Sequence, residues 1–220
     1  MTEQRIGPDK EVTLHFALGL ETGELVDSDA AVDFVKQAEI GVKYRAGGLS
    51  LYATAFDART EEENYEATTQ TVFSRAYKAR GIELEGAYRM GPFSLSAGAT
   101  YTDAEISRDN ISPANVGNTP RRQADWIYQA TAAYDSKLFG LGLNAVGTTD
   151  SYAQDNNQLV LPGFTAVNAF ASYAVSDRMT LSLAVNNLFD TIGYTESNDG
   201  RGAARSINGR TAKATLKYAF

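Results

Sequence analysis

Residues that could support enzyme or metal chemistry are scarce in this chain of 220 residues. It contains no cysteine and a single histidine, His15. Disulfides, thiolate zinc sites and cysteine nucleophiles are therefore excluded. No nucleophile or carboxylate stands at a recognisable spacing from His15, as a catalytic set would require. We expect an exposed strand residue there, no enzymatic activity, no metal site and no cofactor.

Charged residues at alternate positions are a more informative set. In AEIGVKYR (38–45) the apolar Ile40, Val42 and Tyr44 alternate with polar or small residues, and IELEGAYRM (82–90) repeats the pattern. Because a period of two places alternate side chains on opposite faces of a strand, the charges are expected on one face, where they could pair across neighbouring strands or form a solvated wall. These residues are Glu39, Lys43, Arg45, Glu83, Glu85, Arg89, Lys213 and Lys217.

The same alternation predicts about ten strands. They are centred near 11–20, 38–45, 49–58, 79–90, 93–104, 123–135, 138–149, 163–175, 178–189 and 209–220. Short turns rich in Gly, Pro, Asp and Ser alternate along the chain with long polar segments near 21–37, 59–78, 105–122, 149–162 and 190–208. Short and long connections in strict alternation predict an antiparallel up-and-down meander with one plain end and one elaborated end.

Composition limits the possible partners. The chain has 27 acidic and 20 basic residues and a formal net charge of −7, whereas nucleic-acid binding requires a basic surface. No stretch approaches the roughly 18 to 20 apolar residues of a transmembrane helix. The opening MTEQRIGPDKEV is charged and lacks an apolar core, so we expect no signal peptide in this chain.

Strand length separates two architectures. A soluble sandwich uses strands of about 5 or 6 residues around a dry core, whereas a transmembrane barrel uses about 9 to 11. Several runs here are of the longer kind, and charged residues on one face suit a watery lumen. Aromatic residues fall near strand ends, as interfacial girdles require: Tyr44, Tyr88, Tyr101, Trp126, Tyr134, Tyr173 and Tyr218. The pattern favours an all-β, antiparallel transmembrane barrel over a soluble sandwich.

Four segments of the chain form a series of strand pairs with their turns: AEIGVKYRAGGLSLYATAFDA, ARGIELEGAYRMGPFSLSAGATYTDAEI, LPGFTAVNAFASYAVSDRMTLSLAVNNLFDTIGYT and the final GRTAKATLKYAF. Together they resemble the C-terminal barrel half of TonB-dependent outer-membrane receptors. In that family a strand ending N-N-L-F-D precedes a Tyr-containing loop, and the last strand ends in Phe. The resemblance covers roughly 38–220, so residues 1–220 are interpreted as a C-terminal barrel region without a plug domain, with the weakest pattern in 1–37.

The resemblance implies active import of siderophore-bound iron, cobalamin or a similar large nutrient across the outer membrane of a Gram-negative bacterium. It implies the TonB energy-transducing complex, a siderophore-like ligand and outer-membrane lipid as partners, and no nucleic acid. Three alternatives stay open: a truncated product, the distal part of a split reading frame, or a small barrel that closes on itself. The last would be a passive pore or structural scaffold.

Two motifs follow from the resemblance. Ala214, Leu216, Tyr218 and Phe220 fall on one face of the last strand, and in the family such a strand is recognised by the barrel assembly machinery. The strand-end motif is Asn186, Asn187, Leu188, Phe189 and Asp190, in which Asn and Asp are expected to cap turns, with Leu188 and Phe189 anchoring the strand end. Aromatic and Arg residues of the long segments, Arg121, Arg122, Tyr152, Tyr194 and Arg205 among them, could contact a ferric siderophore, although simple solvation also explains them.

Overall fold

The structure, a computed structural model, describes residues 2–5, 10–22, 34–66, 71–197 and 203–220. Antiparallel strands make up nearly all of it, and the one helical element in these ranges is the 3-10 turn η1 (Pro113–Asn115). Within the same ranges no helix is long and apolar enough to cross a membrane. The strands are β1 (Thr2–Arg5), β2 (Lys10–Thr22), β3 (Phe34–Ala46), β4 (Leu49–Glu66), β5 (Thr71–Met90), β6 (Phe93–Asp109), β7 (Trp126–Asp135), β8 (Phe139–Thr148), β9 (Ser151–Tyr152), β10 (Val160–Leu161), β11 (Phe164–Ser176), β12 (Met179–Asn186), β13 (Tyr194–Ser197), β14 (Ala204–Ser206) and β15 (Thr211–Tyr218).

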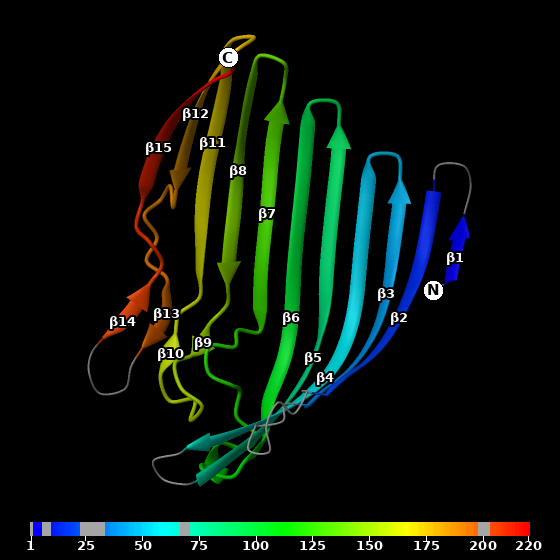
Figure 1. The fold of residues 1–220 in the computed structure, drawn as a ribbon, viewed down its shortest axis with the longest axis vertical. Coiled ribbons are helices and arrows are strands. Elements are labelled where there is room, and N and C mark those ends of the chain that lie inside the picture. The colour runs from blue at the N-terminus through cyan, green and yellow to red at the C-terminus, as the bar shows by residue number, and fades with distance from the viewer. Residues whose placement is uncertain (1, 6–9, 23–33, 67–70, 198–202) are drawn as a thin grey trace.

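Eleven strands form one curved sheet in the order β1-β2-β3-β4-β5-β6-β7-β8-β11-β12-β15 (Figure 1). Two ribbons, β9–β10 and β13–β14, lie at one end of it. We call this the loop end, and the opposite end, where residues 47–48, 91–92, 136–138 and 177–178 join neighbouring strands, the turn end. No ladder joins β15 to β1 or β2 among the described residues, so the sheet they form is open.

All ten predicted strands are present, and the predicted up-and-down order is confirmed. The expectation of a long loop over 59–78 is wrong, because β4 continues to Glu66 and β5 begins at Thr71. The two polar extensions pair with each other from Arg59↔Lys78 to Glu66↔Thr71. Because an antiparallel ribbon outside the membrane can be solvated, neither of its faces has to be apolar. Strand β6 likewise runs to Asp109, into the segment 105–122 that was expected to be loop.

Two strands end earlier than predicted. Strand β12 stops at Asn186, so the rest of the N-N-L-F-D motif follows the strand and does not belong to it. Strand β15 ends at Tyr218, and Phe220 lies beyond it. The short strand β1 was not predicted, and the polar segment 23–33 lies outside the described residues.

One face of the sheet carries large apolar side chains that no part of the described chain covers. Their exposed fractions run from 40% for Val42 to 62% for Leu216. Such a continuous apolar surface is far larger than soluble monomers expose and is suited to lipid. This apolar face includes Ile40, Val42, Leu51, Ile82, Leu84, Leu95, Leu141, Leu143, Leu181, Leu183 and Leu216.

Aromatic contacts border the apolar face at both ends. At the loop end, the rings of Tyr101 and Trp126 are 5.1 Å apart. At the turn end, Tyr134 contacts Phe93 at 4.9 Å and Phe139 at 5.4 Å. Phe93 and Tyr101 are eight positions apart on β6, about 27 Å along the strand. At a strand tilt of about 40° this is about 20 Å along the membrane normal, close to the apolar band of about 25 Å. The expected aromatic girdles are therefore present at these positions.

Candidate functional site on the polar face

The opposite, polar face carries all eight charges predicted from the alternation. Cross-strand register places Lys43 of β3 opposite Tyr52 of β4, and Tyr52 opposite Glu85 of β5. The rows continue through β6, β7, β8, β11 and β12, so the lysines of β15 share this face at the far edge of the sheet. The eight are Glu39, Lys43, Arg45, Glu83, Glu85, Arg89, Lys213 and Lys217.

The charge ladders proposed for this face remain a prediction. Among the described residues, none of the eight takes part in an ion pair. On the β4 side neutral residues stand opposite two of these charges, Tyr52 opposite Lys43 and Ser50 opposite Arg45. On the β2 side the register places Glu11 opposite Arg45.

Two adjoining hollows occupy the polar face. The larger, of about 800 Å³, lies toward the turn end and includes Lys43, Arg45 and Glu85 in its lining. The other, of about 610 Å³, lies toward the loop end and includes Glu83, Arg122 and Tyr194. Glu85 and Gln129 line both, which makes the two hollows one continuous polar surface along the strands.

Arg122 brings a guanidinium from the segment between β6 and β7 to the loop-end hollow. Its backbone has a positive φ of 63°, and its N–H donates to the carbonyl of Tyr152 at 2.6 Å. Its side chain pairs with Glu196 of β13 at 2.5 Å, and Arg205 of β14 reaches the same carboxylate at 3.4 Å. Glu196 thus ties the β13–β14 ribbon to the neighbouring segment and fixes Arg122 at the rim.

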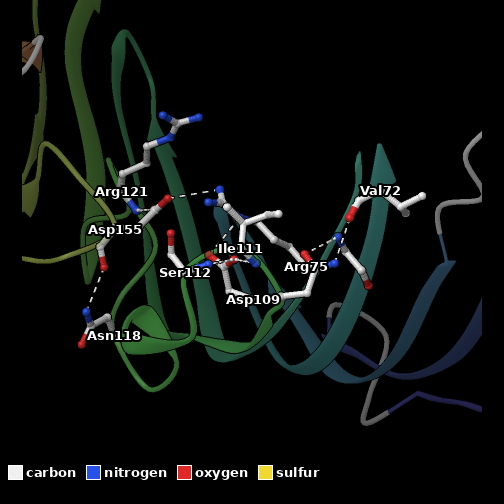
Figure 2. A network of polar contacts seen from close by, with 10 residues as sticks. Val72, Arg75, Asp109, Ile111, Ser112, Asn118, Arg121 and Asp155 are labelled. Carbon is white, nitrogen blue, oxygen red and sulfur yellow. Dashed lines mark hydrogen bonds and ion pairs between the residues drawn. The ribbon is translucent and has the colours of Figure 1, made fainter. Parts of the chain in front are cut away.

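Asp109, at the end of β6, is the most deeply buried carboxylate among the described residues, with its side chain fully inaccessible. Its Oδ1 accepts the N–H groups of Ile111 at 3.0 Å and Ser112 at 2.8 Å. Its Oδ2 makes no hydrogen bond but lies 3.0 Å from Nε of Arg75 in an ion pair. Asp109 therefore starts the turn after β6 and binds it to β5 (Figure 2).

Asp155 extends this network to a second segment. The Arg75 guanidinium donates to Asp155 Oδ2 at 3.2 Å, and Asp155 Oδ1 accepts the N–H of Arg121 at 2.9 Å. The Asn118 side chain donates to the Asp155 carbonyl at 2.9 Å. Figure 2 shows Arg75 reaching from β5 toward both carboxylates, so one guanidinium holds two long connections.

Asn157 adds a reciprocal contact between the same connections. It accepts the N–H of Thr119 at 2.9 Å and donates to the Thr119 carbonyl at 2.7 Å. Its φ of 56° lies in the left-handed region that Asn tolerates. The Arg121–Arg122 segment at the hollow is therefore held by these side chains and by the single backbone hydrogen bond from Arg122 to Tyr152, not by a strand ladder.

Electrostatics favour the charged form of Arg75. Burial acts to lower the pKa of its guanidinium, but attraction to Asp109 and other neighbours outweighs burial, and the pKa lies above its ordinary value. Burial raises the pKa of Tyr77, two residues along β5, and the Glu62 carboxylate adds to that rise. Both groups keep a fixed protonation state at neutral pH. Within the described ranges, no group of three His, Cys, Asp or Glu residues could hold a metal ion.

The strand-end motif forms a compact hydrogen-bonded knot. Asn187 is buried with φ 50°, its Oδ1 accepts the N–H of Thr191, and its Nδ2 donates to the carbonyls of Thr191 and Asn208. Asp190 accepts the N–H of Arg210 at 2.7 Å. The knot thereby joins the end of β12 to the start of β15. Phe189 is 71% exposed, so it does not anchor the strand end in the described structure.

A row of polar side chains leads from this knot into the polar face. The N–H of Asn187 donates to Asn168 of β11, the Asn168 amide donates to Asn144 of β8, and Asn144 donates to Thr131 of β7. Thr131 lines the larger hollow. The motif is therefore connected to the hollow by three consecutive side-chain contacts.

Comparison with known proteins assigns the fold to a family. Residues 34–188 match the profile of the "TonB dependent receptor-like, beta-barrel" family. The chain belongs to this family of TonB-dependent receptor barrels. The resemblance stated from the sequence and the all-β barrel fold are thus confirmed.

The chain is similar to parts of several longer proteins. It is 31% identical over 168 residues to the ferrichrome outer membrane transporter/phage receptor of Escherichia coli K12, covering 70% of this chain and 22% of that protein. It is 27% identical over 196 residues to the pesticin receptor of Yersinia pestis, covering 83% of this chain and 28% of the relative. The ferric yersiniabactin uptake receptor FyuA of Yersinia pestis has the same fold over 99% of this chain and 36% of its own, with a TM-score of 0.78 at 19% identity. The chain therefore spans about a third or less of the length of each of these proteins.

Sequence reasoning found part of the site. Arg121, Arg122, Tyr194 and Arg205 were candidates, and the structure brings Arg122 and Tyr194 to one hollow. It missed the supporting residues Arg75, Asn118, Asn168 and Glu196, whose roles depend on contacts between distant segments. One local signal was present, since Asp109 followed by Asn-Ile-Ser is a typical Asp-capped turn.

Tyr218 and Phe220 form an edge-to-face ring contact at 5.2 Å beside the exposed Leu216.

Proposed function

We propose that this chain forms part of the barrel wall of an outer-membrane receptor that imports a siderophore-bound metal, cobalamin or a similar large nutrient in a Gram-negative bacterium. Family membership and the exposed apolar face support the membrane location. The relatives named above are receptors and transporters, which supports uptake and not catalysis. Movement of the ligand would depend on a plug domain and the TonB energy-transducing complex.

The loop-end hollow carries this proposal. It combines Arg122, a cation held at the rim by Glu196, with the aromatic Tyr194 and the polar Gln129. Ferric siderophore complexes are often anionic, and Arg pairs with oxygen anions through a planar fork of donors. The ion-pair and Asn contacts behind Arg122 fix its position before a ligand arrives, which reduces the entropic cost of binding.

Arg122→Ala tests the ligand role, and Arg205→Ala is the matched control because it pairs with the same Glu196 but does not line the hollow. The test measures uptake of a panel of ferric chelates by cells that carry the altered gene. For one of these chelates, we expect the concentration that gives half-maximal uptake to rise about tenfold, which corresponds to a loss of about 1.4 kcal/mol of binding free energy. Maximal uptake and the amount of receptor in the outer membrane should not change. Equal defects in both variants would assign Arg122 a structural role only.

The end of β15 is proposed as the signal for the barrel assembly machinery, through Ala214, Leu216, Tyr218 and Phe220. Their exposure on a sheet edge fits recognition by strand pairing. Deletion of Phe220 should lower the outer-membrane amount of the protein several-fold without changing ligand affinity per molecule. Lys217→Gln, on the other face, serves as the control. An unchanged membrane amount after deletion would contradict the signal.

A further inference from the structure

The connection between β14 and β15 contains the one Asn-Gly step of the chain, Asn208–Gly209. It lies between the end of β14 at Ser206 and the start of β15 at Thr211, in a stretch without a strand ladder. Both residues are exposed. Because glycine has no Cβ, its backbone nitrogen is open to close approach by a neighbouring side chain. The Asn208 amide carbon and the Gly209 nitrogen are therefore placed where they can react with each other.

The two asparagines that meet in the strand-end knot differ in how far they are held. The amide of Asn187 is bonded at both ends: its Oδ1 accepts the N–H of Thr191 at 2.8 Å, and its Nδ2 donates to the carbonyls of Thr191 at 2.9 Å and Asn208 at 3.0 Å. The backbone N–H that follows it, that of Leu188, donates to the carbonyl of Val167 at 2.6 Å. Both groups that would have to react at Asn187 are thus held in place.

Asn208 lacks this protection. Across the part of the chain that the structure describes, no hydrogen bond holds its side-chain amide or the N–H of Gly209. Asn208 contacts the knot through its main-chain carbonyl, which accepts from Asn187. The space beside Gly209 is open, since a Cβ placed there would meet one atom within 4 Å, Oδ1 of Asp190 at 3.2 Å. The Asn208 side chain can therefore turn toward the Gly209 nitrogen.

We propose that Asn208 is a site of spontaneous deamidation, a modification that changes the main chain at the knot. Hydroxide from the solvent removes the proton of the Gly209 N–H, and the nitrogen forms a bond to Cγ of Asn208. The Cγ–Nδ2 bond then breaks, the leaving nitrogen takes a proton from water, and ammonia departs from a five-membered succinimide ring. Water opens the ring at one of its two carbonyls. The product is an aspartate or an isoaspartate, in which the main chain runs through the former side chain.

The isoaspartate form would loosen the knot. It places one more carbon in the main chain, about 1.5 Å, between the Asn208 position and Arg210, whose N–H donates to Asp190. It also leaves a free carboxylate near Asp190, and like charges at this range repel. The ladder between β12 and β15 begins at Asn186↔Thr211, directly beside the knot. The modification would therefore release the start of the last strand.

The experiment follows the reaction in the purified chain in detergent micelles. The chain is kept in mildly alkaline buffer, and samples taken at increasing times are denatured and digested with trypsin. Cleavage after Arg205 and Arg210 releases the peptide Ser-Ile-Asn-Gly-Arg, whose asparagine, aspartate and isoaspartate forms are separated by chromatography and identified by mass. We expect the asparagine form to disappear about as fast as in denaturant, and Asn187 to stay intact. The rate should rise with pH, because the attacking nitrogen must lose its proton.

Two variants test the chemistry. Asn208→Gln keeps an exposed amide but moves its carbon out of reach of a five-membered ring, so this variant should stay unmodified. Gly209→Ala should react several-fold more slowly, because its Cβ hinders ring closure, and the φ of Gly209 is not positive. A folded chain that keeps its asparagine form while the denatured chain loses it would overturn the proposal, since the knot would then protect the step. Equal loss at Asn187 would also overturn it.

Hydrogen exchange tests the effect on the knot. In the isoaspartate form, the N–H groups of Thr191 and Arg210 should exchange about tenfold faster, as expected when one buried hydrogen bond is lost. Asn208→Asp is the matched control, because it adds the charge and keeps the main chain unchanged, and its exchange should rise less. Unchanged exchange in the isoaspartate form, or an equal rise in Asn208→Asp, would contradict the role of main-chain lengthening.

Discussion

The two ends of the same strands are stabilised in different ways. At the turn end, neighbours in sequence meet through two- and three-residue turns, and the ring contacts of Tyr134 join adjacent strands. At the loop end, Arg75 contacts Asp155, 80 residues away, and Arg122 contacts Glu196, 74 residues away. Local contacts therefore define one end, and polar contacts between distant segments define the other. A single substitution should have a larger and wider effect at the loop end.

The largest effect is expected for Asp109→Ala. The change removes two hydrogen bonds and leaves the partly buried Arg75 without its nearest carboxylate, which should lower the free energy of local opening by about 3 kcal/mol. Hydrogen exchange of residues 110–125 in micelles measures it. Asp103→Ala breaks an exposed pair with Arg80 and should leave the exchange close to that of the unaltered chain. Similar exchange in the two variants would contradict the burial argument.

Asn187→Ala should have the next largest effect, about 2 kcal/mol. The change removes three side-chain hydrogen bonds. It also leaves Ala at φ 50°, a left-handed conformation that Asn tolerates better because its side chain forms local hydrogen bonds. Thermal unfolding in detergent and proteolysis between β12 and β15 provide the measurement. Asn186→Ala is the neighbour control, since Asn186 is exposed and makes one contact of 3.3 Å. An equal loss in the control would show that the knot is not specific to Asn187.

At the turn end, Gly91→Val should cost about 1 to 2 kcal/mol. Gly91 has φ 56°, a conformation that a β-branched residue adopts only with strain, although no neighbouring atom blocks a side chain there. The loss should remain confined to the β5–β6 hairpin in hydrogen exchange. Gly91→Asn, which tolerates this backbone conformation, should recover most of the stability. Increased exchange at 110–125 would break the distinction between the two ends.

The smallest effect is expected from the aromatic border. A double-mutant cycle of Phe93→Leu and Tyr134→Leu should give a coupling of about 1 kcal/mol for the edge contact at 4.9 Å. The cycle of Arg80→Gln and Asp103→Asn, both exposed on the outward face, should give less and should decline with salt. An Arg80–Asp103 coupling larger than the aromatic one would mean that lipid or protein shields that pair from water.

The contrast between the ends also explains what the sequence could predict. Alternation identified every strand that crosses the apolar band, because one face there must be apolar, as in Ile82, Leu84 and Met90. Beyond the band both faces are polar, so the extensions of β4 and β5 carried no alternating signal and were taken for loop. Glu196 and Arg75 have no local pattern, since their partners are distant in sequence. The eight alternating charges share the polar face by register, whereas the ion pairs Lys78–Glu105 and Arg80–Asp103 join neighbouring strands on the outward face.

The eleven-stranded sheet has a consequence of parity. Every neighbouring pair in it is antiparallel, so its two edge strands, β1 and β15, run in the same direction. A second copy of the same sheet, related by rotation about the barrel axis, would therefore present β1 to β15 in parallel. Only an odd number of further strands can bridge the edges with antiparallel ladders throughout. Bacterial barrels of this kind have an even number of strands, so an odd number of further strands must complete this sheet. Two copies of the sheet related by a two-fold rotation could not close a barrel with antiparallel pairing throughout.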